Sequence, residues 1–246
     1  MRKLLYKHIK YAEYYTFLQT FAHPASVSVD IIPLFRANCN HKKLANSRFL
    51  VYTYHILNKM KGGRFMSDKM TQLGFEKLTG EQLTALDLNA FKKIGLDWML
   101  VTAGDENGWN TMTASWGYAG VIWGKNAFQV VIRPQRYTKE FIDKSDYFTV
   151  CFFDEQYKKA LAFCGGHSGR DCDKAKETGL VPVFTDGSVV FEQASMAFVC
   201  KKLYVQEMKP ECFTDKSNIE QWYAGGDYHT QYTGEIVAAY AFRGKR

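Results

Sequence analysis

The sequence predicts a mainly β fold, a β-barrel with short helical insertions. Three observations support this prediction. Apolar segments of strand length recur between residues 97 and 242, turn residues separate neighbouring segments, and short helices with recognisable caps lie between them. Many strands interspersed with short helices are typical of a barrel.

The expected strands follow one another along this region. Residues 97–103 (Asp-Trp-Met-Leu-Val-Thr-Ala) form a buried type of strand, and turn chemistry at 104–109 joins it to a second strand at 110–117. We therefore expect a hairpin here. The remaining expected strands are 128–133, 147–153, 189–191, 194–205 and 232–242.

Helical segments are expected between these strands. Thr79-Gly-Glu-Gln82 fits a capping box before a short helix. The other expected helices are 138–144, a helix capped by Asp154 that runs toward Phe163 and is stopped by Gly165-Gly166, 173–178, ended by Gly179, and 217–222.

The expected strand at 110–117 carries hydroxyl groups at alternate positions. Because side chains alternate along a strand, hydroxyl groups occupy one face and apolar groups the other. The hydroxyl face consists of Thr111, Thr113 and Ser115, and the apolar face of Met112, Ala114 and Trp116. Threonine is also common in ordinary strands. We expect Trp116 to pack in the core, with contact to a ligand ring as the alternative.

Arg133-Pro-Gln-Arg-Tyr-Thr138 follows sixteen residues later. It ends a strand at Arg133 and opens a helix near Thr138, so two guanidinium groups and a hydroxyl gather at a helix N-terminus. Free backbone N–H groups and the helix dipole favour an anion there. The chain has no glycine-rich phosphate loop at this place, which argues against a Rossmann or P-loop site. The pattern instead indicates a phosphate-and-ring site.

The net charge of +7 is unevenly distributed. Residues 1–65 contain 11 Lys and Arg and 2 Asp and Glu, a net charge of +9, whereas residues 66–246 contain 21 and 23, a net charge of −2. Because the basic charge lies outside the motif-bearing region, we do not expect nucleic-acid binding.

Cysteine usage and hydropathy suggest a soluble, cytoplasmic protein. The six cysteines include no Cys-x-x-Cys pair and no zinc-type spacing with histidine, so no metal site is expected. Cys151 and Cys200 lie in apolar strand-like segments and are expected in the core. No apolar segment approaches the length of a membrane span, and charged residues interrupt any signal-peptide core near the start.

Residues 1–65 show no sustained hydrophobic period, and we expect them to form an extension before a domain at 66–246. Codons for Lys61-Gly-Gly could provide a ribosome-binding sequence before Met66. Translation would then start at Met66. The alternative is a genuine basic extension. In either case the extension is not expected to carry the chemistry.

Four motifs resemble one known family in order and sequence. They are Thr111-Met-Thr-Ala-Ser-Trp-Gly117, Arg133-Pro-Gln-Arg-Tyr-Thr-Lys-Glu-Phe-Ile142, Ser168-Gly-Arg-Asp-Cys-Asp-Lys174 and His229-Thr-Gln-Tyr-Thr-Gly-Glu-Ile236. They are similar to motifs of the flavin reductase-like family, most closely its flavoredoxin branch, over residues 77–242. The resemblance implies an antiparallel Greek-key split β-barrel that binds FMN, with the flavin near the interface of a homodimer.

The resemblance also implies which residues contact the flavin. Arg136, with Thr138, is the first choice for the phosphate, while Arg133 either joins it or pairs with a carboxylate. Lys174 either lies near the flavin ring or is solvated. The full expected set is Thr111, Met112, Thr113, Ala114, Ser115, Trp116, Arg133, Pro134, Gln135, Arg136, Tyr137, Thr138, Ser168 and Lys174. Tyr137 is expected either to pack in the barrel or to touch flavin.

No catalytic set is recognisable in the sequence. His167 and His229 are weak candidates, because histidine titrates near neutral pH and can move a proton. His229 matches the late histidine of the family, but Tyr228 is inserted between it and Asp227.

The resemblance predicts an FMN-dependent oxidoreductase that uses NAD(P)H as a transient co-substrate and passes electrons to a flavin, an iron centre or a protein. The loop at 164–170 would form the wall over the ring, with glycines that let it open. The alternative is a flavoredoxin-type electron carrier without NAD(P)H activity. A pyridoxamine-phosphate-oxidase-like enzyme is a third interpretation, disfavoured by the motifs.

Overall fold

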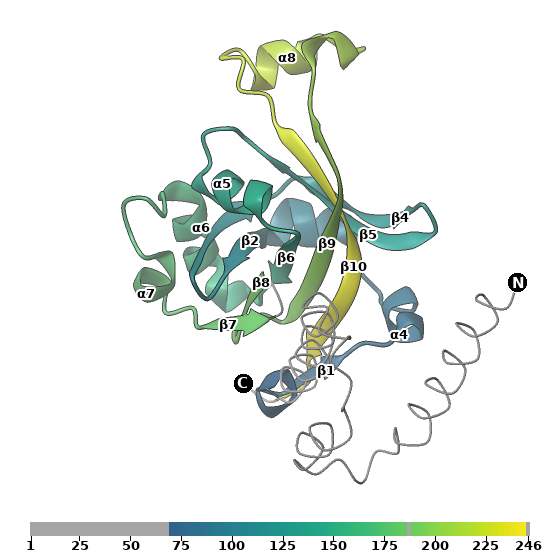
Figure 1. Cartoon of the computed structure of the whole chain (residues 1–246), viewed down its shortest axis with the longest axis vertical. Helices are drawn as coiled ribbons and strands as arrows, with labels where there is room; N and C mark the ends of the chain where they lie inside the picture. The colour runs from purple at the N-terminus through teal and green to yellow at the C-terminus, as the bar shows by residue number, and fades with distance from the viewer. Residues whose placement is uncertain (1–68, 186–187, 245–246) are drawn as a thin grey trace, which may run out of the picture. The chain divides into compact units, whose positions relative to one another are not determined.

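One antiparallel sheet of eight strands organises the fold (Figure 1). The computed structural model describes residues 69–185 and 188–244. The prediction for residues 1–65 and a start at Met66 lies outside these residues and stays a prediction. No helix in the described part of the chain is both long and apolar enough to cross a membrane.

The strand order of the main sheet is β3-β2-β6-β9-β10-β5-β4, and β1 pairs with β10. β3 and β4 lie at the two ends of this path, so the described barrel is split between them. Long connections place β6 beside β2 and β5 beside β10, as in a Greek-key sheet. The predicted mainly β, antiparallel fold is confirmed. The strands are β1 Phe75–Lys77, β2 Met99–Asp105, β3 Gly108–Ala114, β4 Gly117–Ile122, β5 Lys125–Ile132, β6 Tyr147–Phe152, β9 Met196–Glu207 and β10 Thr230–Phe242, with β7 Pro182–Thr185 and β8 Ser188–Phe191 in a separate pair.

Short helices connect the strands, and the predicted caps at Thr79 and Gly179 are present. In the capping box, Gln82 N donates to Thr79 Oγ1 (3.2 Å) and Thr79 N donates to Gln82 Oε1 (2.8 Å). Gly179 ends α7 with a φ of 70°. The helices are α4 Gly80–Thr84, the π-helix η1 Phe91–Asp97, α5 Tyr137–Lys144, α6 Lys158–Gly166, α7 Lys174–Thr178 and α8 Ser217–Trp222, with 3-10 turns η2 Glu155–Tyr157 and η3 Pro210–Cys212.

Several boundaries differ from the sequence-based expectation. The expected strand at 97–103 begins at Met99, because Asp97 still belongs to η1. Strand β4 was not expected: it contains two glycines and is mostly exposed, so it lacks the apolar alternation that identifies a strand. Gly165 and Gly166 form the last turn of α6 instead of following it, and the Asp154 side chain makes no cap hydrogen bond.

The central strands are buried on both faces. On β2, Met99 and Val101 belong to the cluster inside the barrel, and Leu100 belongs to a second cluster with β8 and α6. Cys151 and Cys200 are buried as predicted, and burial raises the pKa of Cys151 to about 12. This double burial fixes β2 and its neighbours β3 and β6 as the rigid frame for the site described below.

The tight turn of the β2–β3 hairpin gives a stability prediction. Gly104 has a φ of +107°, and a Cβ at this position would lie 2.2 Å from Gly108 O. We expect Gly104→Ala to lower the free energy of unfolding by about 2–4 kcal/mol, measured by urea denaturation. Gly120→Ala is the control, because a Cβ at that position would meet no atom within 4 Å. Equal effects of the two substitutions would contradict this account of the turn.

Candidate functional site

Strand β3, the start of α5 and the end of α6 meet at one place. Asn110 Nδ2 donates to Thr138 Oγ1 (2.8 Å), which ties β3 to α5. Thr113 Oγ1 donates to Leu161 O (2.5 Å), which ties β3 to α6. A Cβ on Gly165 would lie 3.2 Å from Thr113 Cβ, so glycine permits this close approach of the helix. The hydroxyl strand therefore holds both helices.

Lys174, the first residue of α7, is buried at this junction. Its Nζ donates to Thr111 O (2.8 Å) and to Cys164 O (2.7 Å), and the residue is only 6% exposed. Burial lowers the pKa of Lys174, and the positive charge of Arg136 lowers it further. No carboxylate pairs with Lys174 among the described residues. The alternative of a solvated lysine is therefore wrong.

Arg136 stands at the N-cap of α5 and is exposed. Its Nη1 donates to Gly165 O (3.0 Å), and it forms no ion pair within the described part of the chain. A guanidinium has five N–H donors, so most of them are free for another acceptor. Its charge lowers the pKa of both Lys174 and His229.

Arg170 and Tyr137 form a contrasting, self-contained group. Arg170 forms an ion pair with Glu140 and lies over the Tyr137 ring, 4.5 Å from the centroid. The Tyr137 ring also contacts Phe141 edge to face at 5.0 Å. Tyr137 thus packs against Phe141 and Arg170, which agrees with the packing alternative; contact with flavin stays a prediction.

Arg133 pairs with a carboxylate, as one of its two predicted alternatives required. Its Nη1 donates to Asp227 Oδ2 (2.5 Å), and its Nη2 donates to Trp222 O (2.8 Å). Gln135 Nε2 donates to the same carboxylate oxygen (2.9 Å). Both partners lie in the β9–β10 excursion, which we define as residues 208–229; it contains α8 and extends from the far end of the two long strands (Figure 1). These contacts attach the excursion to the end of β5.

Trp116 lies between β3 and β4 and is 39% exposed. Its ring contacts the Trp222 ring at 5.0 Å and the His229 ring at 5.3 Å. The expectation that Trp116 packs in the core is wrong, because β3 ends at Ala114 and the alternation of faces ends with it. The tryptophan instead joins the site to the β9–β10 excursion.

His229 is buried, and Tyr223 Oη lies 2.8 Å from its Nδ1. Burial, and then the nearby Arg133 guanidinium, lower the pKa of His229 to about 4. The expectation that His229 titrates near neutral pH is therefore wrong. His167 is exposed and stacks on Phe163 at 3.9 Å, away from these contacts.

The remaining predicted residues divide by burial. Thr111 Oγ1 lies 2.8 Å from Thr102 Oγ1, and the side chains of Met112 and Ala114 belong to the barrel core. Thr138 is fully buried against Asn110. The predicted residues that are at least partly accessible are Thr113, Ser115, Trp116, Arg133, Pro134, Gln135, Arg136, Tyr137 and Ser168.

Sequence reasoning missed Asn110 as a site residue and misread the glycines of the loop. A Cβ on Gly169 would lie 2.0 Å from Asn110 Oδ1, and Gly165 packs on Thr113. Gly165 and Gly169 therefore allow close packing, whereas a Cβ on Gly166 would meet no atom within 4 Å. An amide side chain just before the run of alternating hydroxyls was the available signal for Asn110. The contacts of Arg133 with Asp227, Trp222 and Tyr223 join residues far apart in the chain, so the sequence alone gave no signal for them.

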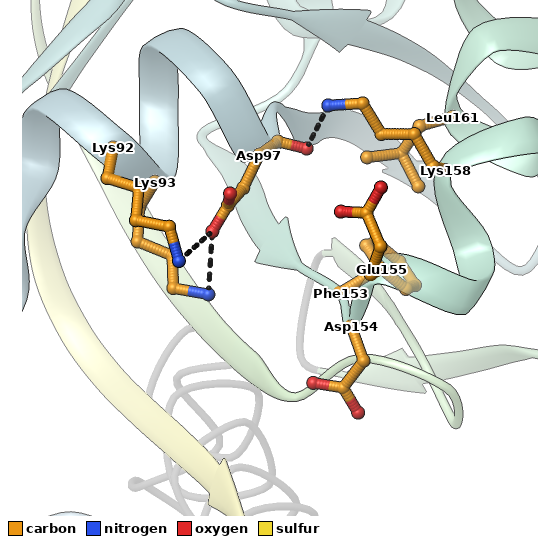
Figure 2. Close-up of a pocket in the computed structure, with 8 residues that line it drawn as sticks. All are labelled: Lys92, Lys93, Asp97, Phe153, Asp154, Glu155, Lys158 and Leu161. Atoms are coloured by element: carbon orange, nitrogen blue, oxygen red, sulfur yellow. Dashed lines mark hydrogen bonds and ion pairs between the residues drawn. The ribbon is translucent and has the colours of Figure 1, made fainter.

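A separate cavity of about 170 Å³ lies at the other end of α6 (Figure 2). Asp97 pairs there with Lys93 (3.1 Å) and Lys92 (3.9 Å), and Lys158 Nζ donates to Asp97 O (3.1 Å). Lys158, which lines this cavity, and Gly165 are seven residues apart on α6, about 10 Å along the helix. Asp97 and main-chain carbonyls thus hold the lysines of this cavity, and we assign no ligand to it.

The fold and the site define a split β-barrel with a cationic site at a helix start. The family model described as "Flavin reductase like domain" matches residues 92–246, and the chain belongs to this family. No curated protein matches the chain.

Solved structures are similar to the chain over about 60% of its length. An FMN-binding protein from Thermus thermophilus is 24% identical over 60% of this chain and 71% of its own, with a TM-score of 0.48. Flavoredoxin from Methanosarcina acetivorans is 19% identical over 60% and 69%, with a TM-score of 0.47. The NADH:FAD oxidoreductase SgcE6 of Streptomyces globisporus C-1027 is 16% identical over 61% and 77%, with a TM-score of 0.45.

The buried neutral His229 predicts a loss of stability in acid. The unfolded chain protonates this histidine near its ordinary pKa of 6.5, but the folded chain does so only near 4. Between these values the unfolded state binds more protons, so stability falls as pH falls. We expect wild type to lose about 2 kcal/mol more than His229→Gln between pH 7 and about pH 4.5 in urea denaturation. Equal losses would show that His229 is not held neutral by the fold.

Proposed function

We propose that this chain is a cytoplasmic FMN-binding oxidoreductase that accepts electrons from NAD(P)H. The proposal rests on membership of the flavin reductase-like family and on one structural observation. Arg136 and Lys174 are two cations that lack carboxylate partners in the described chain, and they donate to neighbouring carbonyls at the end of α6, Gly165 O and Cys164 O. Such a pair calls for an anion, and the phosphate of FMN provides one.

The accessible residues fit the other parts of FMN. Arg136 and the first N–H groups of α5 would hold the phosphate, and the hydroxyl of Ser115 would face the ribityl chain, whereas the hydroxyl of Thr113 is bound to Leu161 O. The half-exposed ring of Trp116 would flank the flat flavin ring. The buried side chains of the predicted set support these groups from behind. FMN, when bound, would supply the electron-transfer chemistry.

The chain's own residues would orient and polarise the cofactor. The ammonium of Lys174 cannot move, because two carbonyls hold it, and its charge would stabilise negative charge developing nearby. His229 would be neutral at pH 7 and would donate or accept a hydrogen bond without adding positive charge. Ser168 lies on the loop after α6, where its Oγ accepts from Arg170 N (3.2 Å).

A specific observation favours a second candidate, an electron carrier that serves a redox partner protein. Gly165 and Gly169 pack against Thr113 and Asn110, so the wall that a nicotinamide would have to displace is held in place. A carrier would need no such opening. This contact pattern is the reason to keep both candidates.

One experiment separates the two candidates and tests the proposal itself. The purified full-length chain is mixed with FMN, freed of excess cofactor, and observed by absorbance under anaerobic conditions. We expect a flavin spectrum that NADH or NADPH bleaches. Bleaching by dithionite but by neither nicotinamide would assign the carrier role. Absence of stoichiometric FMN binding would refute both.

Arg136 is the residue expected to contact the phosphate, and Arg170 provides a matched control. Arg136 has no ionic partner in the described residues, whereas Arg170 is paired with Glu140. We expect Arg136→Ala to weaken FMN binding by about tenfold to a hundredfold, because a charge-assisted hydrogen bond is lost. Arg170→Ala should change it by less than about threefold. Fluorescence titration measures both. Equal affinities for wild type and Arg136→Ala would place the phosphate elsewhere.

We also propose that the chain forms a homodimer with the flavin near the interface. Tyr118 and Tyr204 project from the same face of the sheet, in register through β5 and β10, and are 70% and 42% exposed. The Trp123 ring, 60% exposed, contacts Tyr204 at 6.2 Å. Exposed aromatic side chains grouped on one sheet face favour a protein partner.

The aromatic face gives a prediction for assembly. We expect the double variant Tyr118→Asp, Trp123→Asp to weaken dimerisation at least about tenfold, because aromatic anchors dominate interface energies. Sedimentation velocity over a concentration series measures this. Val181→Asp, at an exposed position outside this sheet face, is the control. A double variant that stays dimeric would place the interface on another face.

A further inference from the structure

His229 is enclosed by aromatic and charged groups from four elements. Tyr223, at the end of α8, contacts it through its ring (5.5 Å) and its hydroxyl (2.8 Å to Nδ1), and the Trp116 ring lies 5.3 Å away. The charged groups that act on it are Arg133 after β5, Arg136 at the start of α5 and Asp227 in the β9–β10 excursion.

The two ring nitrogens of His229 have different surroundings. Nδ1 faces the Tyr223 hydroxyl, whereas Nε2 has no hydrogen-bond partner among the described residues. Because Nε2 lacks such a partner and is not completely enclosed, part of its surface is accessible. A neutral imidazole has one donor and one acceptor nitrogen, and the partner of one nitrogen decides which is which.

The Tyr223 hydroxyl is placed to be the donor. Burial raises the pKa of Tyr223, so its proton is retained. Its other neighbour is Met208 Sδ at 3.5 Å, and a thioether is a much weaker acceptor than an imidazole nitrogen. The Tyr223 ring is held by the Arg133 guanidinium at 5.2 Å and by the Tyr228 ring stacked at 4.9 Å. These contacts keep the hydroxyl oxygen beside Nδ1, and of its two neighbours the imidazole nitrogen is the stronger acceptor for the O–H.

We propose that Tyr223 is a positioning residue: it donates its O–H to Nδ1 of His229 and so holds His229 as a neutral Nε2–H donor beside Arg136 and Trp116. The ligand group that this donor fits is an oxygen or nitrogen acceptor without positive charge. That this ligand is the flavin rests on the proposed function. The assignment of the tautomer does not depend on it. Through Tyr223, the β9–β10 excursion thus sets which nitrogen of His229 carries the proton.

The tautomer is measured by ¹⁵N NMR of the full-length chain labelled at histidine, without added cofactor, at pH 7. We expect His229 Nδ1 in the downfield position of an unprotonated nitrogen and Nε2 in the position of a protonated one. The opposite pattern, or a charged imidazolium, would overturn the proposal even if no variant folded.

Two tyrosine variants then separate positioning from packing. Tyr223→Phe removes the hydroxyl and keeps the ring, and we expect a mixture of both tautomers. Tyr228→Phe keeps the stacked ring and removes a hydroxyl that makes no contact with His229, and should leave the tautomer unchanged. An unchanged tautomer in Tyr223→Phe would overturn the assignment.

FMN titration of the same samples tests the ligand. We expect binding to shift the His229 Nε2 signal, and Tyr223→Phe to bind FMN about threefold to tenfold more weakly than Tyr228→Phe. FMN binding that leaves Nε2 unshifted would overturn the ligand contact. If FMN binds none of the proteins, the proposed function fails, while the tautomer measured without cofactor still decides the role of Tyr223.

Discussion

The buried ammonium of Lys174 is the interaction on which the site depends. An ammonium taken out of water is costly unless its hydrogen bonds are replaced. Here two main-chain carbonyls, Thr111 O on β3 and Cys164 O on α6, replace them. They leave the positive charge itself without a neutralising carboxylate in the described chain. Lys174 therefore fixes α6 against the sheet and leaves the site cationic.

The other elements follow from this anchoring. Asn110 and Thr113 on β3 hold α5 and α6, so that Arg136 at the start of α5 reaches Gly165 O at the end of α6. Glycine at 165 and 169 permits the approach that these contacts require. The rigid, doubly buried strand β2 supports β3 from behind. The result is a cationic site on fixed elements, with aromatic and imidazole groups supplied by the β9–β10 excursion.

Local features of the fold were predictable, and contacts across the sheet were not. The capping box at Thr79, the left-handed Gly179 and the buried Cys151 follow from a few neighbouring residues. The pairing of Arg133 with Asp227 joins residues 94 positions apart, so sequence could offer it only as an alternative. Burial of Lys174 was not foreseen because nothing in a short polar helix distinguishes a lysine that faces inward. The prediction that Trp116 packs in the core was wrong because the alternation of side chains does not show where a strand ends, and β3 ends at Ala114.

The motifs lie on the elements that form the candidate site, but several side chains chosen from them are buried inside the protein. Thr138 and Thr111, chosen for their hydroxyls, use them inside the protein, while Arg136 remains accessible at the surface. The side chains of Met112 and Ala114 serve the core. Any contact of these two residues with FMN would therefore be made by their main chain, and this stays a prediction.

A crystal structure of the full-length chain with FMN tests the central claim most directly. The account predicts the phosphate within hydrogen-bond distance of the Arg136 guanidinium at the start of α5, with the flavin ring beside Trp116 and on the same side of β3 as Lys174. A phosphate bound away from Arg136, or FMN seated instead in the cavity at the N-terminal end of α6, would contradict it.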